Sequence, residues 1–307
     1  MRGTADPALD SLQGLALGDA FGDRWFSVPA DEAPAALAAR LPRPAPWPWT
    51  DDTAMTLVLL RHLRTHGEVR QDALAREFAA EYTGTPHRKY GPSMRRVLRS
   101  VDAGEDWRAV TSSQFGGQGS YGNGAAMRVA PLGAWFADDL DRAAQQAELQ
   151  ALTTHSHPEA VAGAVAVALA AAIAVRSRGD VAPERGELLT EIAGRLPESD
   201  VRSGLRTAAR MPAGTSVRHA AAVLGSGLLL SAPDTVPFAL WSAAGHLDSL
   251  PEALWQTLEG WGDRDTTCAI AGGVVAARTG TAEVPAAWLT AREALPEWVD
   301  EATPTAG

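Results

Sequence analysis

The stretch Thr50-Asp51-Asp52-Thr53 runs directly into the strongly apolar residues 55–63, and this pattern predicts a helix that begins at the acidic residues. A second stretch of the same kind, Asp263-Arg264-Asp265-Thr266-Thr267, opens another apolar, helix-like segment late in the chain. Either stretch alone is typical of a helix N-terminus, because Thr and Asp side chains accept hydrogen bonds from the free backbone N–H groups there. Together, four carboxylates flanked by threonine hydroxyls form an oxygen-only set of ligands, which suits hard cations such as Mg²⁺ or Mn²⁺. We therefore expect the fold to join the two stretches into one metal site.

Helical periodicity runs through the chain and predicts an all-α fold with one domain over residues 1–307. Apolar residues recur at helical spacing between Gly and Pro residues, and the sequence has neither alternating strand-like runs of useful length nor an internal repeat. The expected helices cover residues 8–21, 31–40, 53–67, 70–83, 92–103, 125–137, 139–152, 159–176, 184–195, 199–210, 216–230, 234–246, 250–260 and 268–278, and a short segment at 286–299 closes the fold.

Glycines in the first expected helix predict close packing against another backbone. Gly14 and Gly18 lie four positions apart in this helix, and the expected helix at 268–278 is rich in Gly and Ala as well. Gly22 is a natural C-cap for the first helix. Asp19 lies in its last turn, where a carboxylate opposes the helix dipole; this indicates a positive group nearby, unless the side chain is a solvated surface residue.

The composition is that of an ordinary soluble globular protein, with 46% hydrophobic and 21% charged residues. The net charge of −10 argues against a nucleic-acid scaffold, because phosphate binding requires an excess of Lys and Arg. The single cysteine, Cys268, excludes an intramolecular disulfide, fits a reducing compartment, and is expected to serve packing. No signal-type apolar run follows Met1, so we expect a cytoplasmic protein. The longest apolar tract, residues 160–175, is shorter than the ~20 residues of a membrane-spanning helix and predicts a buried helix with no membrane partner.

Two loop regions are candidates for binding. Residues 23–49 form a long Pro-rich connection, and connections of this kind often serve as lids or binding loops. Gly117-Gln118-Gly119-Ser120-Tyr121-Gly122 matches the dinucleotide-binding pattern, but no buried strand precedes it and no alternation of strands and helices follows. A Gly-rich loop that enters a helix still offers backbone N–H groups to an anion, so we expect a phosphate or diphosphate at residues 120–124. The alternative is a plain flexible loop.

His155 and His157 lie two positions apart on a turn that ends at a proline. They supply only two nitrogen ligands, and Cys268 is too remote in sequence to complete a zinc set. His155 therefore either contacts a bound ligand or has a structural role.

Five segments, in order along the chain, resemble the motifs of the ADP-ribosylglycohydrolase family, which includes dinitrogenase reductase-activating glycohydrolase and the ADP-ribosyl-acceptor hydrolases. Any one of these segments is a weak match, but their common order makes the resemblance specific. The segments are Gly14-Leu15-Ala16-Leu17-Gly18-Asp19-Ala20-Phe21-Gly22, Trp49-Thr50-Asp51-Asp52-Thr53-Ala54-Met55, Ser120-Tyr121-Gly122-Asn123-Gly124-Ala125-Ala126-Met127-Arg128, Thr154-His155-Ser156-His157 and Gly262-Asp263-Arg264-Asp265-Thr266-Thr267.

The resemblance implies an all-α fold with two divalent cations, Mg²⁺ or Mn²⁺, in a cleft, and hydrolysis of the bond between ADP-ribose and a modified side chain. It implies that Asp51 or Asp52 is both a metal ligand and the catalytic base, and that the partner is ADP-ribose or an ADP-ribosylated protein. We expect the protein itself to be a monomer. The implied metal ligands are Thr50, Asp51, Asp52, Asp263, Asp265 and Thr266. The implied substrate-binding residues are Gly119, Ser120, Tyr121, Gly122, Asn123, Gly124, Met127 and His155.

One position departs from the family pattern. Many members carry a glutamate on a loop shortly after the Gly-Asp motif, and by counting that position here is Phe26. Asp23, Asp31 or Glu32 is a candidate to replace it; the alternative is that the metals alone supply the water. The alternatives to a glycohydrolase are a non-catalytic ADP-ribose-binding relative and a metal-dependent phosphoesterase, since the same oxygen ligands suit phosphoryl chemistry.

Overall fold

The computed structural model of the chain describes residues 6–29 and 31–299, which fold into seventeen α-helices and three short 3₁₀ helices. No strand occurs within the described residues, where pairing of the β type is limited to two isolated bridges, Trp47 with Arg292 and Gly122 with Ser231. The expectation of an all-α fold is confirmed. The expected domain also includes residues 1–5, 30 and 300–307, which lie outside the described residues.

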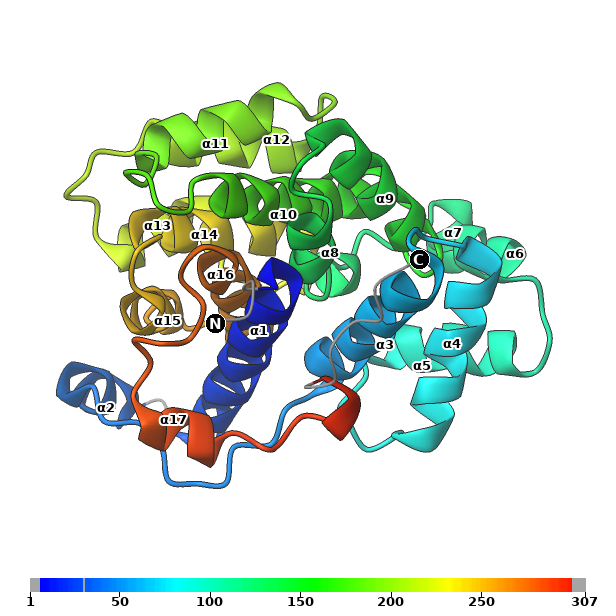
Figure 1. Ribbon diagram of the computed structural model, residues 1–307, viewed down its shortest axis with the longest axis horizontal. Coiled ribbons are helices and arrows are strands. Elements are labelled where there is room, and N and C mark those ends of the chain that lie inside the picture. The colour runs from blue at the N-terminus through cyan, green and yellow to red at the C-terminus, as the bar shows by residue number, and fades with distance from the viewer. Residues whose placement is uncertain (1–5, 30, 300–307) are drawn as a thin grey trace, which may run out of the picture.

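The helices follow one another along the chain with short connections (Figure 1). The α-helices are α1 (Pro7–Asp23), α2 (Ala33–Ala39), α3 (Asp51–His66), α4 (Gln71–Gly84), α5 (Pro92–Asp102), α6 (Trp107–Ser112), α7 (Gln114–Gly117), α8 (Ala130–Trp135), α9 (Leu140–Leu152), α10 (Pro158–Arg176), α11 (Arg185–Gly194), α12 (Asp200–Ala209), α13 (Val217–Leu224), α14 (Ala232–Gly245), α15 (Leu250–Leu258), α16 (Arg264–Thr279) and α17 (Ala286–Ala291), and the 3₁₀ helices are η1 (Arg24–Ser27), η2 (Asn123–Ala125) and η3 (Glu297–Val299).

Helices α1 and α16 form an antiparallel pair whose backbones touch. A Cβ atom on Gly18 would lie 2.0 Å from the carbonyl oxygen of Cys268, and one on Gly22 would lie 2.1 Å from that of Arg264. Gly14 makes the equivalent contact with Gly272, so the predicted close approach of backbones is confirmed. Gly22 is therefore a packing residue inside α1 rather than its C-cap. The pairing places the C-terminal end of α1 beside the N-terminal end of α16.

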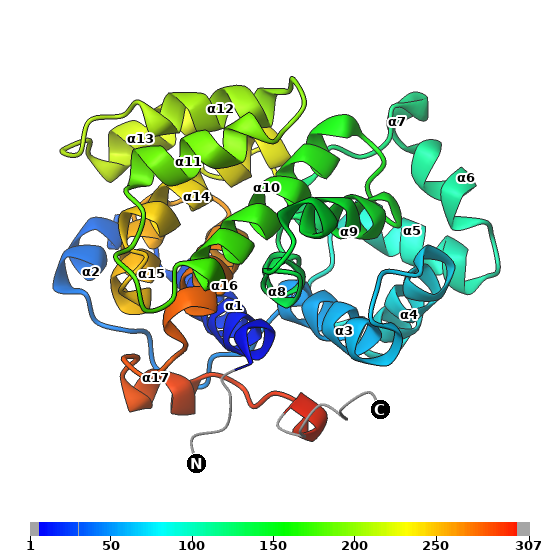
Figure 2. The ribbon, with the colours of Figure 1, turned by 45° about the horizontal axis from the view of Figure 1, so that its top comes forward.

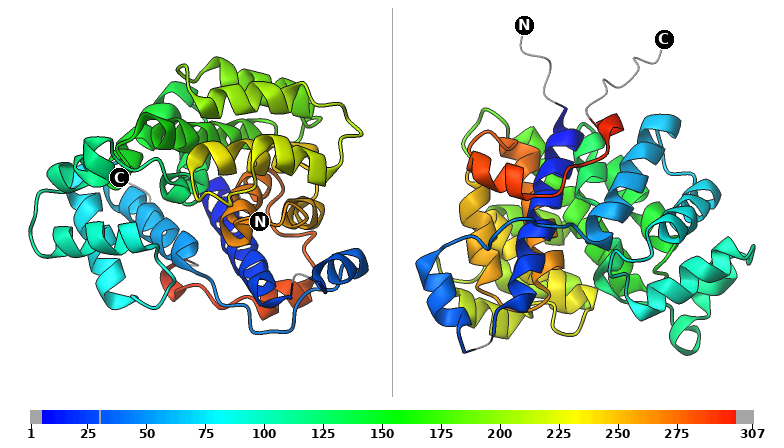
Figure 3. Two further views of the ribbon diagram at one scale, coloured as in Figure 1. Left: turned by 180° about the vertical axis from the view of Figure 1, so that it is seen from behind. Right: turned by 90° about the horizontal axis from the view of Figure 1, so that it is seen from below.

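The pair lies between two groups of helices. Helices α3 to α7 lie on one side of α1, and α11 to α15 lie on the other, in the front view and in the view from behind (Figures 1 and 3). Helix α10 crosses above the pair (Figure 2) and packs against α8, α9, α14 and α16. Among the described residues, it is the one helix that is long and apolar enough to cross a membrane. However, 78% of its apolar stretch is buried inside the protein. The sequence-based interpretation as a buried helix is confirmed.

An aromatic cluster fastens the long connection before α3 to the core. The ring of Phe21 on α1 contacts those of Trp25, Trp47, Trp255 and Trp288, with centroids 5.0–6.5 Å apart. The Trp47 backbone N–H donates to the carbonyl of Ala291, and the N–H of Glu293 donates to the carbonyl of Trp47. The end of this connection is therefore a packed part of the core.

Several predicted boundaries were wrong for local reasons. The helix expected at 125–137 is a 3₁₀ turn followed by α8, because Pro131 is tolerated in a first helical turn but not in a helix interior. The helix expected at 216–230 ends at Leu224, because Gly225 adopts a φ of 86°. The short closing segment contains helix α17 and the 3₁₀ helix η3, and helix α6 was not predicted.

Candidate active site

Asp19 joins the end of α1 to the start of α3. Its buried carboxylate accepts hydrogen bonds from the backbone N–H groups of Thr50 and Thr53, at 2.9 and 3.1 Å, and from both threonine hydroxyls, at 2.9 and 2.6 Å. The positive group indicated by its sequence position is therefore the N-terminus of α3, where free N–H groups favour a carboxylate. The alternative of a solvated surface residue is wrong.

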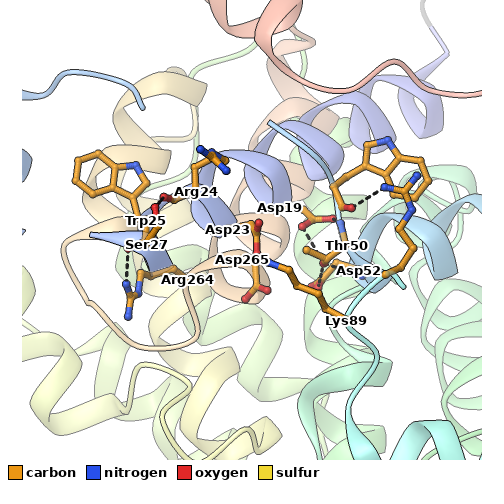
Figure 4. Close-up of polar contacts among 12 residues, drawn as sticks. Asp19, Asp23, Arg24, Trp25, Ser27, Thr50, Asp52, Lys89, Arg264 and Asp265 are labelled. Carbon is orange, nitrogen blue, oxygen red and sulfur yellow. Dashed lines mark hydrogen bonds and ion pairs between the residues drawn. The ribbon is translucent and has the colours of Figure 1, made fainter. Parts of the chain in front are cut away.

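The two acidic stretches meet beside Asp19. Asp51 and Asp52 project from the start of α3, and Asp263 and Asp265 from the start of α16, into one cavity of about 540 Å³. Figure 4 shows the side chains of Asp52 and Asp265 converging on this region from opposite sides.

Burial and mutual repulsion disfavour the ionised form of these carboxyl groups. Burial, followed by the charge of Asp19, raises the pKa of Asp51 to about 7. The same two causes, together with the charge of Asp265, hold the pKa of Asp52 well above its usual range. Burial and the neighbouring Asp263 do the same for the pKa of Asp265. Such a cluster is costly without a counter-charge.

A divalent cation fits this cluster chemically. The Oδ1 atom of Asp52 is buried and has no hydrogen-bond partner in the described part of the chain, an arrangement that usually marks a missing ligand or ion. The surrounding donors are all oxygen atoms, which suits Mg²⁺ or Mn²⁺. Thr266 lines the cavity as well. Thr50 does not; its hydroxyl lies behind the site, within hydrogen-bonding distance of Asp19 and Asp52.

The glycine-rich loop lines the same cavity, but not in the expected way. All of its predicted binding residues except Gly119 face the cavity, whereas Gly119 packs against Ser156, whose Oγ would lie 2.2 Å from an added Cβ. The loop leads into the three-residue turn η2 instead of an α-helix, so it has no helix N-terminus to offer an anion. The cavity residues of this group are Ser120, Tyr121, Gly122, Asn123, Gly124, Met127 and His155.

Asn123 connects the loop to the acidic cluster. Its Nδ2 donates a hydrogen bond to Oδ2 of Asp263 at 2.7 Å and another to the hydroxyl of Thr235 at 3.1 Å. The side chain predicted to bind substrate thus also orients a predicted metal ligand. This contact joins positions far apart in the sequence, and no local pattern indicates it.

The two histidines of the predicted turn have separate roles. His155 is buried at the cavity wall, and burial followed by the charge of Arg128 lowers its pKa to about 3. The ring of His157 accepts a hydrogen bond from the backbone N–H of Glu159 and caps α10. His157 is structural, and the pair does not form a metal site.

Asp23 and Lys89 both line the cavity. The sequence analysis named Asp23 as a candidate but not Lys89. Asp23 lies one helical turn after Asp19, and its buried carboxylate pairs with the ammonium of Lys89 (Figure 4). Asp31 and Glu32, the other candidates to replace the family glutamate, are exposed and lie outside the cavity lining. Lys89 was missed because a lone lysine in a loop carries no local signal.

Phe26 stands at the cavity rim on η1. The guanidinium carbon of Arg264 lies 4.3 Å from the centroid of its ring, and Arg264 also donates a hydrogen bond to the carbonyl of Trp25. An apolar ring held by a cation therefore occupies the position where many family members carry an acid.

A second group of potential ligands lies outside this cavity. His62, His66 and Glu77 bring their ligand atoms within 4.8 Å of one another. The Nε2 atom of His62 accepts a hydrogen bond from the backbone N–H of Arg70 at 3.0 Å, so its proton resides on Nδ1 and is donated to Glu77 at 2.8 Å. A protonated Nδ1 cannot bind a metal, and the group is better described as a hydrogen-bonded contact between α3 and α4.

Comparison with known proteins shows which family the chain belongs to. A family model described as ADP-ribosylglycohydrolase matches residues 2–306. The chain belongs to the ADP-ribosylglycohydrolase family. The expected family resemblance is thereby confirmed.

Individual relatives within and beyond the vertebrates are similar to this family member over most of its length. The ADP-ribosylhydrolase ARH3 of Homo sapiens is 28% identical over 279 residues, which cover 81% of this chain and 76% of that protein. The ADP-ribosylarginine hydrolase Tri1 of Serratia proteamaculans is 24% identical over 300 residues, which cover 92% of this chain and 74% of that protein. A solved structure described as an ADP-ribosylglycohydrolase-related protein complex is 25% identical, with a TM-score of 0.66 and coverage of 94% of this chain and 92% of its own.

Proposed function

We propose that this protein is a metal-dependent hydrolase that cleaves the glycosidic bond between ADP-ribose and a modified acceptor. One observation carries the proposal: carboxylates from α3 and α16, including the unpartnered Oδ1 of Asp52, line the same cavity as residues 120–124. Membership of the ADP-ribosylglycohydrolase family, and relatives described as hydrolases of ADP-ribosyl groups, support this substrate class.

The acidic residues of the cavity would hold two divalent cations. Asp51, Asp52, Asp263, Asp265 and Thr266 offer the ligand oxygens, while Thr50 orients Asp52 from behind. Cations of this kind supply polarisation of hydroxyl oxygens and activation of a water molecule.

The protein residues would divide the remaining work between binding and proton transfer. A cavity of about 540 Å³ is of the size that encloses a small ligand. Phe115 and Tyr121, whose ring centroids lie 6.3 Å apart at the rim, offer apolar faces to the adenine base. As the water oxygen bonds to the sugar carbon and the glycosidic bond breaks, the carboxylate of Asp51 or Asp52 takes the proton of the water, and this proton is passed to the leaving acceptor atom. Negative charge of the cluster stabilises the positive sugar carbon of the oxocarbenium-like transition state.

The proposal is tested by the product that the protein releases. Peptides that carry ADP-ribose on arginine or on serine are incubated with the full chain in Mg²⁺ or Mn²⁺, and in EDTA as the matched control. We expect free ADP-ribose in the presence of the metal and none in EDTA. Release of AMP identifies a phosphoesterase instead, and binding without turnover identifies a non-catalytic ADP-ribose-binding protein.

A further inference from the structure

Arg128 is a fully buried cation directly behind the cavity wall, and the proposed reaction has no role for it. Its Nε donates to Oε1 of Gln150 at 2.9 Å, and its Nη2 donates to the hydroxyl of Thr154 at 2.8 Å. The guanidinium also lies 4.4 Å from the ring centroid of Phe78 and 3.6 Å from the sulfur of Met55. None of these partners is a carboxylate, so the guanidinium donates its hydrogen bonds to neutral groups.

The hydroxyl group of Thr154 connects Arg128 to His155. Its hydroxyl oxygen accepts a hydrogen bond from Arg128 and lies 2.8 Å from Nδ1 of His155. The hydroxyl proton has one other acceptor within reach, the carbonyl of Ala151, at 3.5 Å. That carbonyl already accepts the backbone N–H groups of His155 and Thr154, at 2.8 and 3.1 Å, and has two lone pairs. The threonine proton therefore goes to Nδ1.

An Nδ1 atom that accepts a hydrogen bond leaves the proton of a neutral imidazole on Nε2. The Nε2 edge of His155 faces the glycine-rich loop, where a Cβ on Gly124 would lie 3.1 Å from Nε2 and one on Gly122 would lie 3.3 Å away. Nε2 has no hydrogen-bond partner within residues 6–29 and 31–299. Burial together with the charge of Arg128 lowers the pKa of His155 to about 3, so the ring stays neutral at physiological pH.

We propose that Arg128 and Thr154 form a relay that fixes His155 as the Nε2–H tautomer, so that its ring donates a hydrogen bond to an oxygen atom of bound ADP-ribose. Arg128 and Thr154 are then positioning residues. His155 acts as a neutral donor and neither abstracts protons nor binds metal. The tautomer does not depend on the proposed function, whereas the identity of the ligand rests on it.

The tautomer is measured directly by nitrogen NMR of the full chain labelled with ¹⁵N-histidine, without metal or substrate. In the wild type we expect a proton on Nε2 of His155 and a lone pair on Nδ1. A proton on Nδ1 would overturn the relay. Because this measurement requires no variant, it remains decisive if substitutions impair folding.

Thr154→Val removes the hydroxyl and leaves a side chain of similar shape. We expect His155 to lose its single tautomer and the affinity for ADP-ribose, measured by calorimetry, to fall about tenfold, because one hydrogen-bond donor to the ligand is no longer fixed. Thr154→Ser keeps the hydroxyl and should restore both the tautomer and the affinity. An unchanged tautomer in Thr154→Val would overturn the relay, and a changed tautomer with unchanged affinity would overturn the donor role.

Thr153 provides the matched control, since it is equally buried and its hydroxyl donates to the carbonyl of Gln150 at 2.7 Å without contacting His155. Thr153→Val should lose a similar amount of stability while the tautomer and the affinity for ADP-ribose remain those of the wild type. If the tautomer is as expected but ADP-ribosylated peptides are not cleaved, the proposed hydrolase function fails and the relay stands.

Discussion

The two carboxylate oxygen atoms of Asp52 differ in their hydrogen bonding. Oδ2 lies 3.0 Å from the hydroxyl of Thr50, whereas the buried Oδ1 contacts no donor among the described residues. A buried carboxylate with one unsatisfied oxygen costs stability, and the neighbouring aspartates add to that cost. A bound cation would offset this cost.

Replacing Asp52 by Asn tests both the stability cost of this carboxylate and its proposed role as a metal ligand. In EDTA we expect the variant to be at least as stable as the wild type, because a neutral amide relieves the crowding of carboxyl groups. In Mg²⁺ at about a hundred times its dissociation constant, the wild type should gain about 2.7 kcal/mol and the variant much less. Thermal unfolding measures both quantities, and Asp138→Asn, at an exposed aspartate, is the control. An equal response of Asp52→Asn and the wild type to Mg²⁺ would contradict the assignment of Asp52 as a ligand.

The buried His155 predicts a loss of stability in acid. Its pKa is lowered to about 3 in the folded protein, while the unfolded chain takes up the proton at about 6.5. Protons therefore favour the unfolded state, and stability is lost as the pH falls through the unfolded value, by about 2 kcal/mol from this residue between pH 7 and pH 5. Urea unfolding at the two pH values should show a drop that is smaller by this amount in His155→Gln. Identical drops in both proteins would show that His155 is protonated in the folded state.

At the scale of helices, the contact of α1 with α16 governs the site. Gly14, Gly18 and Gly22 recur every four residues and form one face of α1, which allows the backbones to touch. Because the pair is antiparallel, the last turn of α1 lies beside the first turn of α16. Asp19 and Asp265 are brought together by this register.

Gly18→Ala should separate the two helices. The added Cβ would lie 2.0 Å from the carbonyl oxygen of Cys268, a backbone atom that cannot rotate away, so we expect a loss of about 3 kcal/mol in unfolding free energy. The control is Gly84→Ala at the last residue of α4, where an added Cβ meets nothing within 4 Å. That substitution should change stability by less than about 1 kcal/mol. Similar stabilities of the two variants would refute the tight register.

For the molecule as a whole, the site couples segments that the chain keeps far apart. The start of α3 and the start of α16 face one cavity but belong to helices on different sides of α1. An ion held by both would stabilise both ends against local opening, because it binds only when both are in place.

Hydrogen exchange measures this coupling. Adding Mg²⁺ should slow amide exchange in the first turns of α3 and α16 together, and Asp265→Asn, on α16, should abolish the effect in α3 as well. The exposed end of α12, remote from the cavity, serves as the internal control within the same experiment. Slowing confined to one of the two helices would show that the two acidic stretches do not share an ion.

Helical periodicity, the two acidic stretches and the glycine spacing in α1 were legible in the linear sequence, because each depends on residues within a few turns of one another. Together with the glycine-rich loop and the order of the family motifs, they predicted the all-α class, the family and many of the residues that line the cavity; Thr50 and Gly119 lie behind it, and Lys89, which lines it, was not predicted. The cap that Asp19 places on α3, the pairing of Asp23 with Lys89, and the approach of Arg128 to Thr154 were not legible. Each of these contacts joins separate elements, and whether such side chains meet depends on the register and crossing of packed helices, which no local pattern specifies.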